Sequence, residues 1–539
     1  MAVVPVGVDA RPQLAYQPTI PVIVRRACVE FSDEDIVVLP DRSITFSQLE
    51  EESRRLAKQL LFAGVGKGSR VGIHLPTGPE WVVAFVAATR IGAIAMPFST
   101  LYRPHELREA LRIGDVSLLI SVDTMMGKQH QDFLEAAIPG LAESRPGTLF
   151  AAEVPFLRAV WMLGDCERAW ATCTSLRNET PTALPEVDEA ILEAAEAQVS
   201  AADPMVAVFT SGTTAEPKAV IHTHGAAIRK TSRSADGSLN AQYGGRVLAL
   251  MPFFWVGGLQ EVLSAIQSGA TVVTLERLDA AAAVELGVRE RVTSVMGNAT
   301  AMRSVLGDIE LSEAIPTLRP LPPRPWAAGP SSLGHESVAI GMTETFGPWN
   351  SVSGMECRII DPKTGLPCAE GRVGEFQIRG YALMHGLYKR EREDTFTADG
   401  FYATGDLGYR ENDRFYFAAR MKDLIKTKGA NVAPAEVEAV LNAAAGVRMS
   451  FVYGSPHEIH GEEVIAGVVV EPGRVVDAEE LIGYCRTRLS SYKVPRVVVL
   501  LGIDEIPYLA SSKPDRIAIR AMLETRCAAM PKAKSNLNP

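Results

Sequence analysis

The segment Met205-Val-Ala-Val-Phe-Thr-Ser-Gly-Thr-Thr-Ala-Glu-Pro-Lys-Ala-Val-Ile221 places a polar loop, Thr210 to Lys218, between two apolar runs. Each apolar run has the length of a short buried strand, so we expect a strand, a loop and a second strand. Hydroxyl and amide N–H groups in such a loop can face anionic oxygens. Pro217 limits the freedom of the loop, and Lys218 adds a positive charge. This composition predicts a phosphate-binding loop.

The loop lacks the GxxxxGK[ST] pattern, which argues against a P-loop kinase or GTPase. A flexible Ser/Thr linker stays open as an alternative on the loop alone. The loop resembles the TSGTTGxPKG signature of the adenylate-forming superfamily, which comprises acyl-CoA synthetases, peptide-synthetase adenylation domains and firefly luciferase. Ala215 and Ala219 replace the two later glycines. The resemblance implies that the phosphates of ATP are held by Thr210, Ser211, Gly212, Thr213, Thr214 and Lys218, with Thr214 also catalytic.

Length and composition limit the class of protein. A chain of 539 residues is too long for one core, so we expect at least two domains. The net charge of −10 without a basic block argues against nucleic-acid binding. Seven cysteines without a CxxC pair indicate reduced thiols. Residues 1–20 lack a signal-peptide pattern, and Thr89, Arg90 and Gly92 interrupt the apolar stretch Trp81–Phe98, so we expect a cytoplasmic protein without a transmembrane segment.

Helical and strand patterns alternate in the first part of the chain. Thr45-Phe-Ser-Gln48 is a capping-box pattern that predicts the start of a helix. The segments that follow are predicted as strand 70–75, helix from 79, strand 93–97, helix 105–112 and strand 116–121. Residues 186–202 are acidic and rich in alanine, which predicts a surface helix. The alternation predicts an α/β domain with a mostly parallel sheet, and this region is also similar to the N-terminal part of the superfamily.

Gly341-Met-Thr-Glu344 is a short motif that the resemblance makes informative. A glycine allows close approach of a ligand, and a carboxylate suits Mg²⁺, which prefers oxygen ligands shared with phosphates. In the superfamily this motif is [YFW]GxTE, which implies that Glu344 is a catalytic residue and binds Mg²⁺, and that Gly341, Met342 and Thr343 contact the nucleotide. Ile340 occupies the position where an aromatic residue often stacks near the adenine.

Two later motifs extend the resemblance. Asp406 in Tyr402-Ala-Thr-Gly-Asp406 can accept both ribose hydroxyls, although an aspartate in a surface turn is a common alternative. Residues 420–438 resemble the pattern R-x-[DK]-D-x-[IL]-K-x-x-G-x-x-[VI]-x-P-x-E-[VI]-E. The resemblance implies that Arg420 contacts the nucleotide, that Lys422 is the hinge between two domains, and that Lys428 and Gly429 line the path of CoA.

The segment Met251-Pro-Phe-Phe-Trp-Val-Gly-Gly-Leu259 combines aromatic residues with paired glycines, which suits either the wall of a ligand pocket or a core turn. In acyl-CoA synthetases the corresponding segment shapes the acyl pocket, and a histidine often stands where this chain has Trp255. The resemblance implies an apolar acyl pocket lined by Trp255, Gly257, Gly258, Gly297, Asn298 and Met342.

The last motif, Ile506-Pro-Tyr-Leu-Ala-Ser-Ser-Lys513, resembles the P-x-T-x-x-G-K loop, with Leu509 and Ser512 as departures. It implies that Lys513 is catalytic and neutralises charge as a carboxylate attacks the α-phosphate. The expected architecture is α/β: a large N-terminal domain of mixed and parallel sheets with helices (1–419), a hinge (420–423) and a small mobile α/β domain (424–539) whose tail is disordered from about residue 526.

The resemblance implies an ATP-dependent carboxylate–CoA ligase of fatty acid metabolism, acting on a fatty or other bulky hydrophobic acid, with Mg²⁺ as cofactor and ATP, CoA and the acid as partners. Two alternatives stay open. The first is an adenylation enzyme that loads a carrier protein. The second is a catalytically impaired acyl- or nucleotide-binding relative, since the chain is shorter than expected between Gly329 and Gly341 and between Glu344 and Met355.

Overall fold

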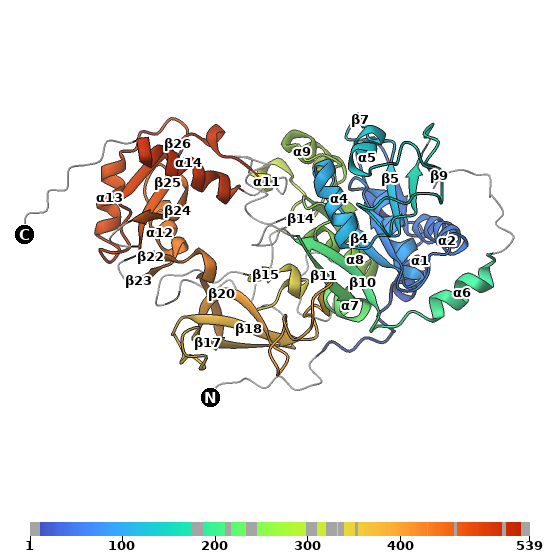
Figure 1. Cartoon of the computed structure of the whole chain (residues 1–539), viewed down its shortest axis with the longest axis horizontal. Coiled ribbons are helices and arrows are strands. Elements are labelled where there is room, and N and C mark those ends of the chain that lie inside the picture. Colours follow the sequence, from blue (N-terminus) through green and yellow to red (C-terminus); the bar gives the residue numbers. More distant parts are fainter. Residues whose placement is uncertain are drawn as a thin grey trace, which may run out of the picture.

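The computed structural model describes residues 11–164, 166–174, 187–210, 217–232, 245–297, 310–319, 331, 339–350, 354–427, 430–457, 461–508 and 514–529. A large part of the chain contains three extended sheets, and a smaller C-terminal part contains a fourth (Figure 1). Two short two-stranded sheets, β6–β7 (Thr124–Met125 and Lys128–Gln129) and β15–β16 (Gly341–Met342 and Gly347–Pro348), complete the strands. Among the described helices, no helix is long and apolar enough to cross a membrane.

An eight-stranded sheet forms the centre of the large part. Its strands lie in the order β19 (Gly386–Leu387), β11 (Lys218–Thr223), β10 (Pro204–Thr210), β4 (Ile94–Pro97), β3 (Arg70–Ile73), β5 (Leu118–Val122), β8 (Ala159–Leu163) and β9 (Thr172–Thr174). The strands from β10 to β9 are parallel, and β11 and β19 join antiparallel. The predicted α/β class with a mostly parallel sheet is therefore confirmed.

A second sheet lies beside the first, with helices between the two. Its order is β14 (Ser294–Met296), β12 (Arg246–Ala249), β13 (Thr271–Val273), β1 (Asp35–Val38) and β2 (Ser43–Thr45). The largest core cluster joins residues of both sheets to α1 (Ile20–Phe31), α2 (Phe46–Phe62), α3 (Pro79–Arg90) and α8 (Val256–Ser268). Burial of these apolar faces is the main favourable term in the folding of this part.

The other face of the central sheet is covered by α4 (Pro104–Ile113) and α5 (Gln131–Ala137), whose apolar residues join a second core cluster. The described residues of the large part also form the helices α6 (Glu189–Ala197), α7 (His224–Thr231), α9 (Ala280–Arg289) and α11 (Leu311–Ala314). Thr45 begins α2 with a reciprocal capping box to Gln48, as its sequence predicts. The predicted helix at 186–202 is α6, and it is shorter than the acidic segment.

A third, antiparallel sheet consists of β17 (Met355–Ile360), β18 (Gly374–Gly380), β20 (Tyr402–Glu411) and β21 (Arg414–Arg420). The 3-10 turn η2 (Met421–Asp423) leads from β21 to the fourth sheet, β23 (Ala430–Val432), β22 (Ile425–Thr427), β25 (Gly461–Val470), β24 (Val447–His457) and β26 (Val497–Leu501). This sheet carries α12 (Pro434–Asn442), α13 (Ala478–Arg486), η3 (Ile503–Glu505) and α14 (Arg516–Ala529). The domain boundaries stay a prediction.

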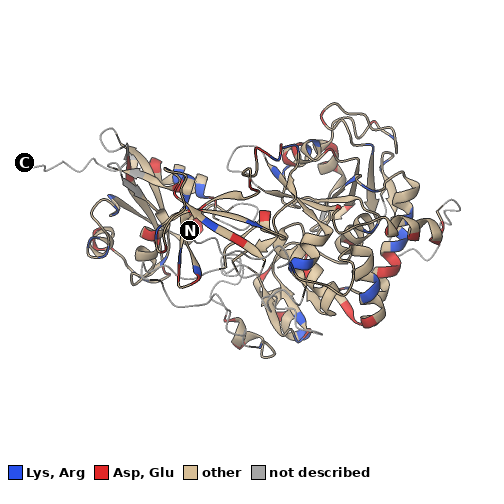
Figure 2. Ribbon diagram, turned by 90° about the horizontal axis from the view of Figure 1, so that it is seen from below, with Lys and Arg blue, Asp and Glu red and all other residues tan. Residues whose placement is uncertain are grey.

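Helix α14 extends past residue 526, where the disordered tail is expected to begin, and ends at Ala529. The helix is held there because Leu523 is buried in a core cluster and Cys527 packs against the same cluster. Figure 2 shows Lys and Arg interspersed with Asp and Glu over the described ribbon. A ligand with several negative charges therefore needs locally placed cations in this protein.

Candidate active site

Strands β10 and β11 form the frame of the predicted phosphate loop. They pair antiparallel, with Thr210 directly opposite Lys218 at the open end of the pair. The Thr210 hydroxyl lies 3.5 Å from the Lys218 carbonyl. The two predicted strands are therefore confirmed, while the loop between them, with Ser211, Gly212, Thr213 and Thr214, lies outside the described residues.

Glu344 lies on the 3-10 turn η1 (Thr343–Thr345), which connects β15 to β16. Its backbone carbonyl accepts the N–H of Met384 at 2.7 Å, and its Oε1 accepts the hydroxyl of Tyr402 at 3.2 Å. Burial and the nearby Glu344 charge raise the pKa of Tyr402, so this phenol stays a proton donor at neutral pH. Gly341 and Met342 form β15, which places the whole motif in one hairpin.

Ile340, next to this hairpin, is not available as a stacking surface. It is only 6% exposed and belongs to a core cluster with Trp349 and Phe376. The position where relatives often carry an adenine-stacking aromatic is therefore a core position in this chain.

Asp406 and Arg420 face each other across strands β20 and β21. Their side chains form an ion pair with Nε to Oδ1 at 2.6 Å, and Asp406 is 3% exposed. Burial raises the pKa of Asp406 to about 6, although Arg420 opposes the shift. The charges of Glu344, Asp423 and Glu375 raise it further, so negative charge exceeds positive charge here.

Glu344 and the carboxylates near it fit a magnesium ion that is shared with a substrate. No group of three or more His, Cys, Asp or Glu side chains that could hold a metal occurs among the described residues. Mg²⁺ is commonly bound by one or two carboxylates together with substrate phosphates, not by a cage of protein ligands. A carboxylate on a half-buried turn, in a region with excess negative charge, suits that mode of binding, and Glu344 is that carboxylate.

Trp255 is the N-cap residue of α8 and is partly exposed, with its ring edge-to-face against Phe254 at 5.3 Å. Gly258 is required by packing, because an added Cβ would lie 2.3 Å from the Pro252 carbonyl oxygen. An added Cβ at Gly257 would lie 3.2 Å from the Met251 methyl group. The two glycines therefore let α8 begin close to the preceding turn, which the core-turn interpretation explains; the pocket-wall role stays a prediction.

Gly297 follows β14, while Asn298 lies outside the described residues, so the predicted pairing of these two residues at a pocket is untested. Lys428, Gly429 and Lys513 also lie outside them. Lys422 is exposed on η2, between the third and fourth sheets.

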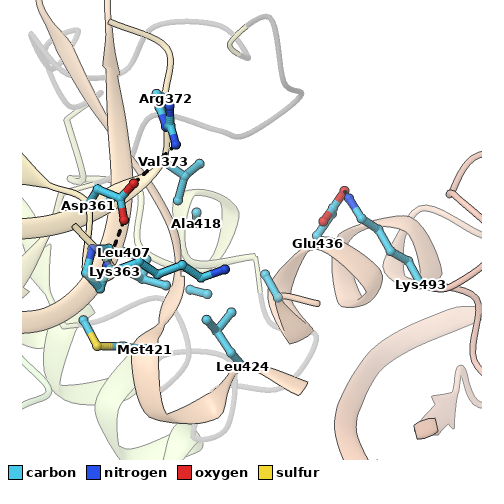
Figure 3. A pocket seen from close by; sticks show the side chains of 14 residues that line it. Asp361, Lys363, Arg372, Val373, Leu407, Ala418, Met421, Leu424, Glu436 and Lys493 are labelled. Carbon is cyan, nitrogen blue, oxygen red and sulfur yellow. Dashed lines mark hydrogen bonds and ion pairs between the residues drawn. The ribbon is translucent and has the colours of Figure 1, made fainter. Parts of the chain in front are cut away.

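A cavity of about 600 Å³ lies beside η2 (Figure 3). One wall comes from the third sheet, at Leu407 and Ala418, and the other from Ala433 and Glu436 of the C-terminal part. Charged groups at its edge form ion pairs, Arg372 with Asp361 and Lys493 with Glu436. Both parts therefore line this cavity, and β21 and α12 also lie close together across the junction.

One residue that sequence reasoning missed is His222. Its Nε2 lies 2.7 Å from the Thr343 carbonyl, although the two residues are 121 positions apart. Its ring is also edge-to-face with Phe346 at 4.9 Å. A lone histidine in a strand carries no signal of such a partner, so only the folded chain could reveal this contact.

Comparisons with known proteins agree with this architecture. YngI of Bacillus subtilis (strain 168), which is named as a candidate acyl-CoA synthetase, is 29% identical over 91% of this chain and 94% of its own length. The 4-coumarate–CoA ligase 5 of Oryza sativa subsp. japonica is 28% identical over 89% of this chain and 90% of its own. The long-chain-fatty-acid–CoA ligase of Bacillus subtilis (strain 168) is 26% identical over 94% of each chain.

Among solved structures, the anthranilate CoA ligase AuaEII in complex with anthranoyl-AMP has the same fold. Its TM-score is 0.74 at 20% identity, and the match covers 96% of this chain and 99% of that one. The family profile of the AMP-binding enzymes matches residues 24–388, and that of the AMP-binding enzyme C-terminal domain matches residues 436–513. The chain therefore belongs to the AMP-binding enzymes, the adenylate-forming superfamily that its motifs resemble.

Proposed function

We propose that this protein is an ATP-dependent carboxylate–CoA ligase. In the first step an oxygen of the acid attacks the α-phosphate of ATP, and diphosphate leaves to give an acyl-adenylate. In the second step the thiol of CoA, after losing its proton, attacks the acyl carbon and AMP leaves. The overall reaction converts acid, ATP and CoA to acyl-CoA, AMP and diphosphate. Catalysis is then mainly positioning and charge stabilisation.

The observation that supports this proposal best is the combination of Glu344 with the Asp406–Arg420 ion pair. Tyr402 donates to Glu344 from the same strand that carries Asp406, so the two carboxylates belong to one electrostatic unit. An ionised Asp406 can accept two ribose hydroxyls, and Arg420 keeps it in place. Curated relatives that span about nine-tenths of the chain and are named as CoA ligases support the same reaction.

The phosphates of ATP bind at the loop between β10 and β11 in this proposal. Thr210 to Thr214 and Lys218 hold them at the open end of β10 and β11, and Gly341, Met342 and Thr343 lie along the nucleotide. Glu344 holds Mg²⁺, which when bound supplies positive charge to the phosphate oxygens. Lys513 neutralises the charge that develops as the carboxylate attacks.

The second step uses other residues of the C-terminal domain. Lys428 and Gly429 line the path of CoA, and the domain turns about Lys422 to bring them to the site. Lys422 is exposed on a short turn between the third and fourth sheets, where a few residues can absorb such a rotation. We place the large domain at 1–419, the hinge at 420–423 and the small domain at 424–539.

The acid in this proposal is fatty or otherwise bulky and hydrophobic. The partly exposed indole of Trp255, next to Phe254, supports an apolar wall made with Gly257, Gly258, Gly297 and Asn298. The names of the relatives do not indicate one class of acid for this chain, since they include sulfoacetate, 4-coumarate and long-chain fatty acid.

The test measures diphosphate release with ATP, Mg²⁺ and a panel of acids, with and without CoA, and follows the thioester by mass spectrometry. We expect acid-dependent diphosphate and CoA-dependent thioester, with the highest kcat/KM for fatty or other bulky hydrophobic acids. Adenylate without any CoA thioester would contradict the CoA step and favour an enzyme that loads a carrier protein. Absence of acid-dependent turnover over a broad panel would contradict the proposal and favour a binding protein with this fold.

A further inference from the structure

The turn that carries Glu344 is held by side chains from three different elements. The Thr343 carbonyl accepts from His222 Nε2 of β11 at 2.7 Å, and the Phe346 carbonyl accepts from Gln260 Nε2 of α8 at 2.6 Å. The Pro348 carbonyl accepts from the Lys230 ammonium of α7. The Thr343 carbonyl also accepts the Phe346 N–H at 3.0 Å within the turn, so His222 adds a second donor to it. The three side chains connect the backbone of the turn to β11, α8 and α7.

The backbone of this turn needs such support. Phe346 has φ of 50°, in the left-handed region that bulky residues rarely adopt, and it is fully buried. Gly347 follows with φ of 103°. A strained backbone of this kind persists only where its surroundings fix it, and strain of this kind gathers at functional sites.

His222 differs from the other two donors because of the strand on which it lies. Residues at positions i, i+2 and i+4 of a strand share one face, so Lys218, Val220 and His222 point to the same side of β11. Val220 belongs to a core cluster with Met384 and Phe396, and Tyr402 packs against that cluster. Met384 and Tyr402 both donate hydrogen bonds to Glu344. The face of β11 that carries Lys218 therefore contacts the surroundings of Glu344.

The hydrogen bond to Thr343 also fixes the tautomer of His222. A carbonyl oxygen can only accept, so Nε2 carries the proton. Burial lowers the pKa of His222 to about 4, although the bond to Thr343 opposes the shift, so the imidazole is neutral at physiological pH. The hydrogen bond is therefore a fixed connection at that pH and not a switch.

We infer that His222 is a positioning residue that sets the place of Glu344 relative to Lys218. The inference rests on the proposed function, in which Glu344 holds Mg²⁺ and Lys218 holds phosphate, and it adds the group that keeps these two at a fixed separation. His222 does not touch the nucleotide in this role. It acts through the Thr343 carbonyl, one residue before Glu344.

Two substitutions separate this role from simple packing. His222→Leu keeps an apolar side chain of similar size and removes the N–H donor, while His222→Gln keeps an N–H near the position of Nε2. The control is His224→Leu, which removes another fully buried imidazole, one that accepts the Ile20 N–H at 3.3 Å and makes no recorded hydrogen bond to the described 343–348 turn.

The first measurement is the Mg²⁺ dependence of diphosphate release at saturating ATP. We expect His222→Leu to raise the half-saturating Mg²⁺ concentration about tenfold, the size of one lost hydrogen bond. His222→Gln should restore at least half of this change, and His224→Leu should lower the melting temperature without moving the Mg²⁺ midpoint. An unchanged midpoint in a folded His222→Leu protein would overturn the inference.

The second measurement does not depend on turnover. Hydrogen exchange of the peptide 339–350 should be faster in His222→Leu and normal in His222→Gln. Calorimetry should show that a given Mg²⁺ concentration improves ATP affinity less in His222→Leu than in the wild type. If the wild-type protein releases no diphosphate with any acid, the proposed function fails, while these two measurements still decide the role of His222. Wild-type exchange of the peptide in His222→Leu would overturn that role.

Discussion

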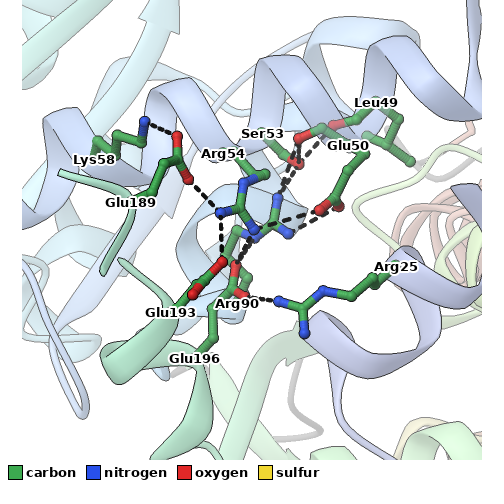
Figure 4. Close-up of polar contacts among 10 residues, drawn as sticks. All are labelled: Arg25, Leu49, Glu50, Ser53, Arg54, Lys58, Arg90, Glu189, Glu193 and Glu196. Atoms are coloured by element: carbon green, nitrogen blue, oxygen red, sulfur yellow. Dashed lines mark hydrogen bonds and ion pairs between the residues drawn. The ribbon is translucent and has the colours of Figure 1, made fainter. Parts of the chain in front are cut away.

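Two regions of this molecule bury carboxylates, and they treat the charge in opposite ways. In the large domain, Arg90 is 0% exposed and Glu196 is 5% exposed. The Arg90 guanidinium donates to Glu196 and to Glu50, each at 2.8 Å (Figure 4). Arg25 and Arg54 add further positive charge around Glu196. This network joins α1, α2, α3 and α6, so its role is to hold helices together.

Among the described residues of the candidate site, by contrast, carboxylates outnumber the cations that face them. Arg420 is the ion-pair partner of Asp406, while the charges of Glu344, Asp423 and Glu375 repel the Asp406 carboxylate. The comparison teaches that burial alone does not mark a functional group. A buried charge with full compensation indicates structure, and one with partial compensation indicates a place for a ligand.

The largest effect that would sharpen this comparison is on stability. We expect Glu196→Gln to lower the free energy of unfolding by about 3–5 kcal/mol, because it leaves the buried Arg90 guanidinium without its full partner. Urea unfolding of the variant gives the value. The matched control, Glu193→Gln, changes an exposed member 3.9 Å from Arg54 and should cost about 1 kcal/mol or less. Equal losses in both variants would break the comparison.

Next in size is Glu344→Gln, which we expect to reduce adenylation by at least about 100-fold. Loss of a group that only supports a metal ligand costs up to about 100-fold, and Glu344 is proposed as the ligand itself. An amide is a poorer Mg²⁺ ligand than a carboxylate. The same variant should unfold at the wild-type urea midpoint, since Glu344 is half-buried and makes one hydrogen bond to Tyr402. Diphosphate release at limiting Mg²⁺ checks the first part, and wild-type turnover there would remove Glu344 from the metal site.

A smaller effect concerns the pH dependence of ribose binding. Because the pKa of Asp406 is raised to about 6, only about one tenth of it is ionised at pH 5. The ionised form accepts ribose hydroxyls, so affinity for adenosine should rise about tenfold from pH 5 to pH 8. Calorimetry with adenosine, which carries no titrating phosphate, gives the profile. Asp406→Asn should bind weakly with a flat profile, and a sloping profile in that variant would assign the titration elsewhere.

The smallest effect is expected at Glu261, which is 3% exposed and, among the described residues, has no partner for its Oε1. Burial raises the pKa of Glu261 to about 8, so the side chain is neutral at pH 6. At pH 4, where this carboxyl is mostly protonated in the unfolded chain as well, we expect Glu261→Gln to change the free energy of unfolding by less than about 1 kcal/mol, in contrast to Glu196→Gln at neutral pH.

The sign of this effect follows from linkage. The pKa of Glu261 is higher in the folded state than in the unfolded state, so the folded state binds the proton more tightly. The free energy of unfolding is therefore highest below the unfolded-state pKa, and it falls as the pH rises toward 8. At pH 9 the glutamine variant should therefore be more stable than the wild type. Thermal melts at pH 4 and pH 9 test this, and a wild type that gains stability over this range relative to the variant would contradict it.

Much of the site could be predicted from the sequence because its signals are local. Local signals predicted the two strands on either side of the phosphate loop, the capping box at Thr45 and the start of α12 at Pro434. Each of these features depends on residues that are neighbours in the chain. The motifs around Glu344, Asp406 and Arg420 are likewise short runs at fixed spacing. Such patterns fix the backbone and the chemistry of the side chains before any long-range contact forms.

What only the tertiary structure decided is which charges and donors meet. Arg90 interrupts an apolar segment in the sequence, and the folded chain brings Glu196, 106 residues away, against it. His222 and Thr343 are 121 residues apart in the chain and form a hydrogen bond, and no pattern in either segment predicts this contact. Pairing of this kind follows from how sheets and helices pack, so the sequence by itself determined the chemical groups of the site, and the packing decided their partners and their pKa values.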